Sequence, residues 1–219
     1  VLVGGVAVCI MSLSTYNSLR LARDQYYQEH RFPHVFIGLK RAPLSLLKTI
    51  SNLPHVTDLQ ARVVAPANLT VRGFNEPIQG LITSIPDQYG DQGSELNQLY
   101  RVRGRYPDSR RDDEVVLSEG FADAHQLQPG DHLWAVINGR RKALRIVGIA
   151  LSPEHIYQIA PGAVFPDYLR FGVLWMAYTP LSKAFDMDEA FNDLVVERDA
   201  QGSDAELIKR LDETLANYG

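Results

Sequence analysis

The sequence predicts an α+β fold: a discontinuous α/β subdomain of the βαβ type, an inserted β-rich subdomain, and an N-terminal membrane or stalk helix before both. Three observations predict it. The chain starts with an uncharged apolar run, both ends of the remaining chain alternate strand and helix patterns, and the middle holds short strands between sharp turns. With 219 residues, 45% of them hydrophobic, the chain can bury the core of one large or two small domains.

The first element is an N-terminal helix. Residues 1–19 carry no charged side chain, and as a helix they would rise about 28 Å, close to the roughly 30 Å thickness of a bilayer core. Residues 14–31 contain no Gly or Pro and continue the helix as a stalk, which Pro33 ends. We predict a transmembrane-helix remnant and stalk over 1–32, and the start at Val1 suggests a piece of a longer protein. A buried core helix or strand and a secretory signal are the alternatives.

The first α/β pattern covers residues 33–90. A strand is predicted at 35–39 and a helix from residue 44 to residue 53, which Pro43 opens because its missing N–H costs little in a first helical turn. Three further strands are predicted at 58–64, 69–71 and 80–85.

The second α/β pattern covers residues 190–219. A strand at 193–198 is followed by Ser203 and, three positions later, Glu206, which together make a capping box at the start of a helix. That helix is expected to place four apolar residues on one face, namely Leu207, Ile208, Leu211 and Leu215. We therefore predict that residues 33–90 and 190–219 form one α/β subdomain.

The segment between them, residues 91–189, is predicted to be an inserted β-rich subdomain. Residues 87–113 are charged and turn-rich and look like a junction. Asn138-Gly139 is a strong signal for a type I′ hairpin turn, and Ser118 suits the N-cap of a short helix. The expected elements are strands at 114–117, 132–137, 140–151 and 172–178 and helices at 119–125 and 181–185.

Composition and motifs argue against several classes of function. A net charge of −4 gives no support for nucleic-acid binding. Cys9 is the only cysteine, which excludes an intrachain disulfide and a thiolate metal cage. The sequence contains no Walker A, G-x-S-x-G, H-E-x-x-H or G-x-G-x-x-G motif. We therefore expect no catalytic residue, no cofactor and no metal, and do not expect an enzyme.

Two groups of residues resemble chemical sites and have simpler explanations. His30 and His34 have the spacing of metal ligands, but Pro33 lies between them and breaks a shared helix. Glu154-His155 lies near Ser152, yet neighbours in sequence rarely form a catalytic triad.

A long loop with apolar side chains, residues 153–167, is the best candidate for an interaction surface. Such residues either mark a partner surface or pack beneath the loop as a satellite core. With neighbours just beyond the loop, the candidate partner or substrate surface is Ile156, Tyr157, Ile159, Phe165, Arg170, Phe171 and Trp175.

A basic cluster precedes the insertion's first predicted strand and consists of Arg101, Arg103, Arg105, Arg110 and Arg111. It could meet lipid headgroups or an acidic partner. Interleaved acidic residues neutralise it, so a solvated loop is the favoured interpretation.

Several stretches, in order, resemble the periplasmic core domain of the MacB/FtsX-type ABC transporter permease family. They are Tyr26-Tyr27 before Phe36, Leu53-Pro54-His55-Val56, Arg103-Gly104-Arg105-Tyr106-Pro107, Asp113-Glu114-Val115-Val116-Leu117, Ala124-His125-Gln126-Leu127 leading into Pro129-Gly130-Asp131, and Ile146-Val147-Gly148-Ile149. The resemblance covers nearly the whole chain, and its specificity lies in the ordered combination rather than in any single motif.

The resemblance implies a non-catalytic domain that lies after the first transmembrane helix of a permease in the bacterial inner membrane and faces the periplasm or cell exterior. It implies an α/β subdomain made from both ends of the segment with a β-rich insertion. The implied partners are a cytoplasmic ABC ATPase, reached through the permease's membrane part, and a second permease copy or a periplasmic protein. The implied roles are substrate export, lipoprotein release or coupling to periplasmic partners.

Two other functions remain open. The first is a membrane-anchored extracytoplasmic sensor or assembly module, which a ligand pocket lined by His155, Tyr157 and Trp175 would favour. The second is a soluble hydrolase of unrecognised type.

Overall fold

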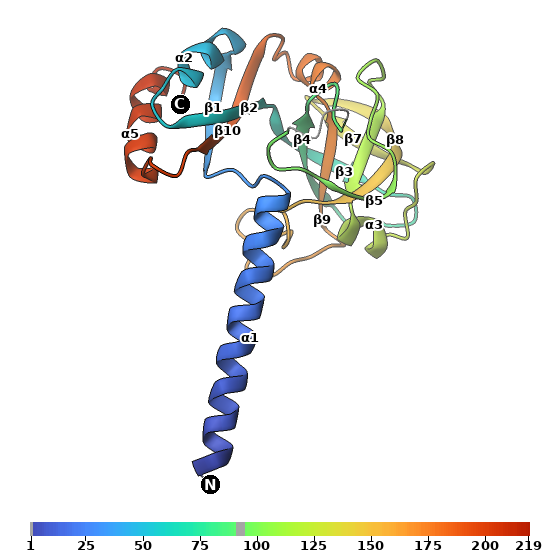
Figure 1. Ribbon diagram of the computed structural model, residues 1–219. Helices are drawn as coiled ribbons and strands as arrows, with labels where there is room; N and C mark the ends of the chain where they lie inside the picture. The colour runs from blue at the N-terminus through green and yellow to red at the C-terminus, as the bar shows by residue number, and fades with distance from the viewer. Residues whose placement is uncertain (1, 91–94) are drawn as a thin grey trace.

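The computed structural model describes the backbone of residues 2–90 and 95–219, and side chains over the same ranges except residues 2–10, 12, 13 and 24. Helix α1 (Leu2–Glu29) projects from the rest of the protein, the head, which comprises residues 33–219 (Figure 1). The apolar part of the predicted membrane segment falls mostly on side chains outside this description. Across the part that is described, no helix is long and apolar enough to cross a membrane.

One sheet of the head combines both ends of the chain. It has three strands, β1 (Val35–Pro43), β2 (Val56–Arg62) and β10 (Ala190–Arg198), in the order β1-β10-β2. Both β1 and β2 pair antiparallel with β10, so they run parallel to each other as a βαβ crossover requires, with β10 between them.

Two helical segments accompany this three-stranded sheet. The crossover contains a 3₁₀ turn (Leu44–Leu46) and α2 (Leu47–Ser51), and α5 (Asp204–Leu215) follows β10. Their apolar faces and the sheet share one core, whose buried members include Ile50, Phe191, Leu194, Leu207 and Leu211. Ser203 accepts a hydrogen bond from the Glu206 N–H and so caps α5 as predicted. Ile208, which was expected on the buried face, is instead exposed.

The second sheet has seven strands. They are β3 (Val64–Thr70), β4 (Ile78–Ile85), β5 (Tyr100–Gly104), β6 (Glu114–Ser118), β7 (His132–Ile137), β8 (Arg140–Leu151) and β9 (Phe171–Ala177). Their order is β5-β8-β6-β9-β4-β3-β7, and β7 also pairs with β8, so six of the strands close into a ring with β5 at its side. The long strand β8 makes this closure because its first half pairs with β7 and its second half with β6 and β5.

The interior of this ring is the largest core of the protein, and its fully buried large side chains include Phe121, Leu117, Leu133, Ile146 and Leu174. Two short helices, α3 (Glu119–Ala124) and α4 (Tyr178–Ala184), follow β6 and β9. The turn between β7 and β8 has positive φ at both Asn138 (47°) and Gly139 (74°), which confirms the predicted hairpin.

The structure corrects three details of the sequence interpretation. Strands β3 and β4 pair within the seven-stranded sheet, so residues 64–85 do not belong with the α/β part as the boundary at residue 90 required. The predicted junction at 87–113 contains β5, an edge strand that pairs only with β8. Ser118 occupies the N-cap position of α3 without capping it, because its hydroxyl donates to the side chain of Gln158. The division into separately folding domains stays a prediction.

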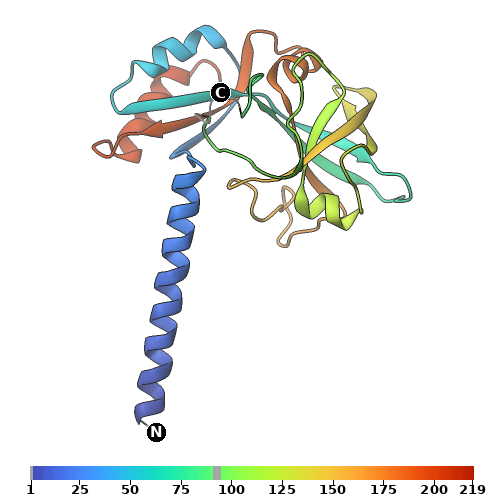
Figure 2. The same cartoon turned by 45° about the vertical axis from the view of Figure 1, so that its right-hand side comes forward.

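The chain changes sheets at Val63, the residue between β2 and β3. Asn192 of β10 fastens this crossing: its Oδ1 accepts from the Val64 N–H and its Nδ2 donates to the Val64 carbonyl, both at 2.8 Å. Figures 1 and 2 show the two sheets side by side at one end of α1.

Candidate functional site

The loop between β8 and β9, residues 152–170, carries most of the candidate interaction surface, and most of its large apolar residues are exposed. Tyr157 is 73% exposed, and Val164 and Phe165 are each 79% exposed. The remaining exposed large hydrophobic residues of the β8–β9 loop are Ile156, Ile159 and Leu169. Of the two interpretations that the sequence left open, a satellite core under the loop therefore does not apply to these side chains.

The other residues of the predicted surface behave differently. Phe171 and Trp175 are wrong as surface residues, since they are 5% and 3% exposed and pack in a core cluster with Val116 and Val173. Both belong to β9, which has neighbouring strands on both sides and is buried at every position. Arg170 is half exposed, and its guanidinium pairs with Asp167 and Glu76.

Polar and aromatic contacts fix the base of the β8–β9 loop from inside. Gln158 is buried, and its Oε1 accepts a 2.7 Å hydrogen bond from the Ser118 hydroxyl. The ring of Tyr168 packs so closely on Gly120 that a Cβ there would lie 2.7 Å from it. The loop is thus held at two points while the apolar side chains between them face outward.

A cluster of polar side chains lies where the two sheets meet; we call Arg62, Asn97, Glu154 and Asp193 the junction cluster. The Arg62 guanidinium is 4% exposed and donates to Asp193 from Nε and to Glu154 from Nη1, both at 2.6 Å. Asn97 donates to the same Glu154 carboxylate from Nδ2 at 2.5 Å. The cluster joins β2 and β10 of the three-stranded sheet to the segment before β5 and to the start of the β8–β9 loop.

The two carboxylates of the junction cluster differ in acidity. Burial opposes ionisation of Glu154, but the charge of Arg62, the hydrogen bonds from Arg62 and Asn97 and the nearby His155 together outweigh it and lower the pKa of Glu154. Burial raises the pKa of Asp193, and the attraction of Arg62 only partly offsets this because the Glu154 charge is nearby. One guanidinium therefore serves two acids, of which Asp193 is the easier to protonate.

The geometry does not favour catalysis at Ser152, Glu154 and His155. The Ser152 hydroxyl is buried and accepts from the Glu154 N–H, while the Glu154 carboxylate is committed to Arg62. Burial lowers the pKa of His155 despite the adjacent carboxylate, so its ring is neutral near pH 7. Nor do His155, Tyr157 and Trp175 line one pocket, because Tyr157 points to solvent while Trp175 is in the core.

The end of α1 is fixed to the head by charge and by aromatic contacts. Arg31 donates to Asp58 of β2 at 2.9 Å and to Glu197 of β10 at 2.6 Å. Its carbonyl accepts from the Asn97 N–H at 2.9 Å, which links the stalk directly to the junction cluster. Beside it, the rings of Tyr27, Phe32 and Phe36 follow one another at centroid distances of 4.5 and 5.3 Å. The end of α1 is therefore connected directly to β2 and β10, and through Asn97 to Glu154 of the junction cluster.

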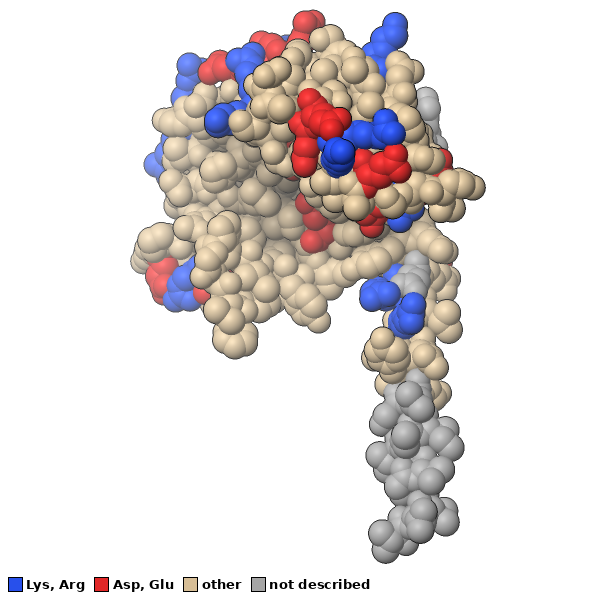
Figure 3. Space-filling view, turned by 90° about the vertical axis from the view of Figure 1, so that its left-hand side faces the viewer, with Lys and Arg blue, Asp and Glu red and all other residues tan. Residues whose placement is uncertain are grey.

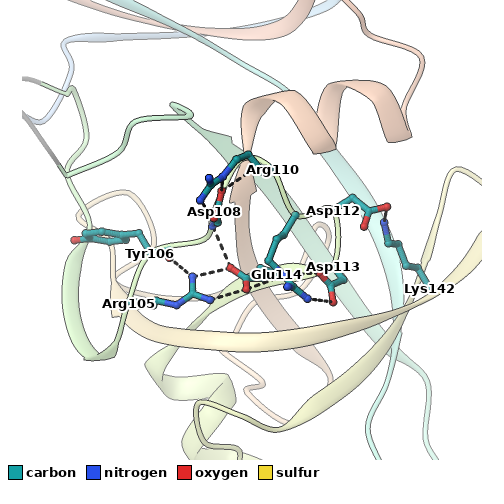
Figure 4. Close-up of polar contacts among 9 residues, drawn as sticks. Arg105, Tyr106, Asp108, Arg110, Asp112, Asp113, Glu114 and Lys142 are labelled. Atoms are coloured by element: carbon teal, nitrogen blue, oxygen red, sulfur yellow. Dashed lines mark hydrogen bonds and ion pairs between the residues drawn. The ribbon is translucent and has the colours of Figure 1, made fainter.

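The basic cluster is neutralised, as its acidic neighbours indicated. Arg105 makes two hydrogen bonds to Glu114, whose side chain is buried, and hydrogen bonding to Arg105 lowers the pKa of that carboxyl (Figure 4). Arg110 pairs with Asp108, and Arg111 pairs with Asp113 and Glu114. Arg103 pairs with Asp123, and the guanidinium of Arg101 lies over the ring of Tyr106.

Histidine positions also match the simpler explanation. His30 packs edge-on against Tyr26, and Nδ1 of His34 accepts from the Arg198 N–H at 3.4 Å. Within the described part of the chain, no group of three His, Cys, Asp or Glu side chains is arranged to hold a metal ion.

Sequence reasoning missed the junction cluster, and only a weak signal pointed to it. Arg62 lies within the predicted strand 58–64 and Asp193 begins the predicted strand 193–198, and the sequence around neither residue indicates its partner. Their partners come from distant parts of the chain, with Arg62 and Asp193 separated by 131 positions.

Comparisons with known proteins rest on structure. No protein-family model matches the chain, and no curated protein sequence is significantly similar to it. The extracellular domain of the ABC-type transporter YknZ from Gram-positive bacteria aligns with a TM-score of 0.50 and 13% identity, over 83% of this chain and 95% of that one. The chain shares the fold of that extracellular domain. This confirms the resemblance at the level of a mixed α and β fold, and the detailed arrangement of subdomains stays a prediction.

Two further structures align at lower TM-scores. The periplasmic region of MacB from Actinobacillus actinomycetemcomitans gives 0.48 with 17% identity, over 80% of this chain and 73% of that one. A domain of a candidate permease protein from Porphyromonas gingivalis gives 0.45 with 12% identity, over 87% and 85%.

Proposed function

We propose that this chain is the extracytoplasmic domain of an ABC transporter permease in a bacterial inner membrane. In this role it is not an enzyme: it binds a substrate or partner and passes conformational change between the membrane and that partner. The observation that carries the proposal is the fold shared with the extracellular domain of an ABC-type transporter. A cytoplasmic ATPase, acting through the membrane part of the permease, is the expected source of energy.

The connection between stalk and head supports a mechanical role. Arg31 connects the end of α1 to both β2 and β10. Its carbonyl also accepts a hydrogen bond from the N–H of Asn97, whose side chain donates to Glu154. Glu154 lies at the start of the β8–β9 loop, whose exposed apolar side chains are the proposed contact surface. A tilt of α1 would therefore shift the three-stranded sheet and this loop together, which is what transmission from the membrane requires.

The residues at this connection also suit transmission because they are constrained in one arrangement. Separating a buried guanidinium from its two carboxylates costs much more free energy than separating a surface ion pair. Small displacements of α1 are then passed on rather than absorbed by a flexible joint. The closed ring of six strands, which has a continuous hydrogen-bonded backbone, would move as one body.

The test uses the full-length protein in its native membrane. A topology reporter fused after Gly219 shows which side of the membrane the head faces, and affinity purification shows whether an ABC ATPase accompanies it. We expect an extracytoplasmic reporter and a stoichiometric ATPase. A cytoplasmic reporter would overturn the proposal. An extracytoplasmic reporter without any ATPase would favour a membrane-anchored sensor or assembly module.

A further inference from the structure

The β8–β9 loop contains an unusual stretch, because residues 156–166 carry no charged side chain and yet face solvent over much of their length. Isolated exposed hydrophobic residues are ordinary on a protein surface, but several on one loop mark an interaction site. Here the most exposed members are an aromatic pair, Tyr157 and Phe165, together with Val164.

The position of the β8–β9 loop relates it to the stalk. In Figures 1 and 2 the loop lies on the underside of the seven-stranded sheet, the side toward which α1 runs away from the head. On the face drawn in Figure 3, the underside between the outer edge of the head and α1 is mainly free of Lys, Arg, Asp and Glu. The loop therefore faces whatever surface the N-terminal part of α1 enters.

The charges that border the stretch pair with one another. Arg170 lies between Asp167 and Glu76, at 2.9 Å from the first and 2.5 Å from the second, so the edge of the loop presents no strong field of either sign. A charged protein partner would have little to recognise here. A neutral apolar loop with exposed aromatic side chains matches the boundary between lipid headgroups and acyl chains, where amphipathic aromatic rings concentrate.

From the uncharged stretch, its exposed aromatic side chains and its place on the α1 side of the head, we propose that the β8–β9 loop is a membrane contact. Tyr157, Val164 and Phe165 enter the interfacial layer of the bilayer that anchors α1. This inference rests on the proposed membrane anchorage. A single loop of this size binds lipid weakly on its own, but tethering by α1 raises its effective concentration at the surface enough for contact to persist. The base contacts at Gln158 and Tyr168 keep the apolar side chains pointing outward before the membrane is reached.

The test places one fluorescent label on the loop of the full-length protein. Cys9 is the only cysteine of these 219 residues, so Cys9→Ser, with serine also replacing any cysteine elsewhere in the full-length protein, gives a background without thiols, and Val164→Cys adds a single site. A second variant, Phe165→Cys, repeats the measurement one position away. Thr49→Cys is the matched control, because Thr49 is exposed on α2, which lies on the far side of the head from the free end of α1. Each labelled protein is reconstituted in phosphatidylcholine vesicles with and without a lipid that carries a quencher in its acyl chain.

We expect label emission at residue 164 and at residue 165 to shift to the blue and to be quenched by the acyl-chain quencher, while the label at residue 49 does neither. High salt should leave the quenching unchanged because no charge is involved. Equal, water-like emission at all three positions overturns the membrane contact. So does emission that changes only when other membrane proteins are added, which would assign the loop to a protein partner. Either of these results, obtained while the ATPase still co-purifies, refutes the loop's role and leaves the proposed function standing.

Discussion

Replacing Arg62 by Met would test how much the junction cluster stabilises the head. The substitution keeps a long apolar side chain but leaves two carboxylates, Glu154 and Asp193, without their buried cation. Breaking a buried pair in this way costs about 3–5 kcal/mol. Both carboxylates retain some exposure and Glu154 keeps Asn97, so we expect the lower end, about 3 kcal/mol.

The loss of stability in Arg62→Met should depend on pH in a defined direction. Without Arg62, burial is expected to hold the folded-state pKa of both carboxyls above the unfolded values of about 4. A carboxyl whose folded pKa is raised destabilises the fold when ionised, and the penalty disappears as pH falls through its folded pKa and below its unfolded pKa. The difference in stability between the wild type and Arg62→Met should therefore be largest near neutral pH and narrow as pH approaches about 4.

Thermal unfolding followed by circular dichroism, with the full chain in detergent, measures the effect. A loss of about 3 kcal/mol corresponds to a fall in Tm of roughly 6–12 °C for a protein of this size. Arg110→Gln is the control, because Arg110 is 87% exposed and its surface ion pair with Asp108 should contribute little to stability. Removing all three charges, with Arg62→Met, Glu154→Gln and Asp193→Asn, should restore much of the loss. Equal Tm values for Arg62→Met and Arg110→Gln would refute the reasoning.

Three further outcomes are expected from other contacts. Hydrogen bonding to Arg105 lowers the pKa of Glu114, so the ionised carboxylate stabilises the fold above about pH 4.5, and this contribution is lost as pH falls through the folded pKa. In Glu114→Gln the free energy of unfolding should therefore fall less steeply with decreasing pH than in the wild type. An unchanged pH dependence would contradict this. Burial raises the pKa of Tyr89, whose hydroxyl accepts from the Leu99 N–H, so stability should fall as pH rises above about 10 in the wild type and less steeply in Tyr89→Phe. Gly104→Ala should cost about 1–3 kcal/mol in urea unfolding, because φ is +76° and a Cβ would lie 2.2 Å from a carbonyl oxygen, whereas Gly38→Ala meets no atom within 4 Å and should change little.

Local signals in the sequence predicted local structure well. Asn138-Gly139 adopts the backbone that a two-residue hairpin turn demands, and Ser203 makes the cap that its spacing from Glu206 indicated. Each of these features depends on a few adjacent residues, whereas at Ser118 a distant partner, Gln158, replaced the predicted helix cap.

Features that depend on distant pairing were harder to predict. The edge strand β5 (Tyr100–Gly104) contains two Arg and a Gly and gains its strand character from residues 148–151 of β8, each more than forty positions beyond its partner in β5. Its neighbours in sequence are turns and charges, which favoured a junction. The sheet boundary at Val63 was missed for the same reason, since only long-range pairing assigns β3 and β4 to the seven-stranded sheet.

The candidate surface residues within the loop are exposed, whereas those assigned from the adjoining strand are buried and the assignment was wrong there. Ile156, Tyr157 and Phe165 are exposed on the loop, but Phe171 and Trp175 belong to the uninterrupted apolar run of β9. Such a run, without polar alternation, indicates a strand buried on both faces. That pattern was sufficient to exclude both residues from a surface.

Hydrogen exchange at the junction tests the transporter role most directly. The full-length protein is purified with its ATPase, and exchange is compared between nucleotide-free and ATP-bound states at the amides of Asn97 and Glu154. We predict that the exchange rates of these amides differ between the nucleotide-free and ATP-bound states. With a catalytically inactive ATPase that stays in one state, we predict no such difference. Identical exchange in both states, with an active ATPase present, would contradict transmission through this domain.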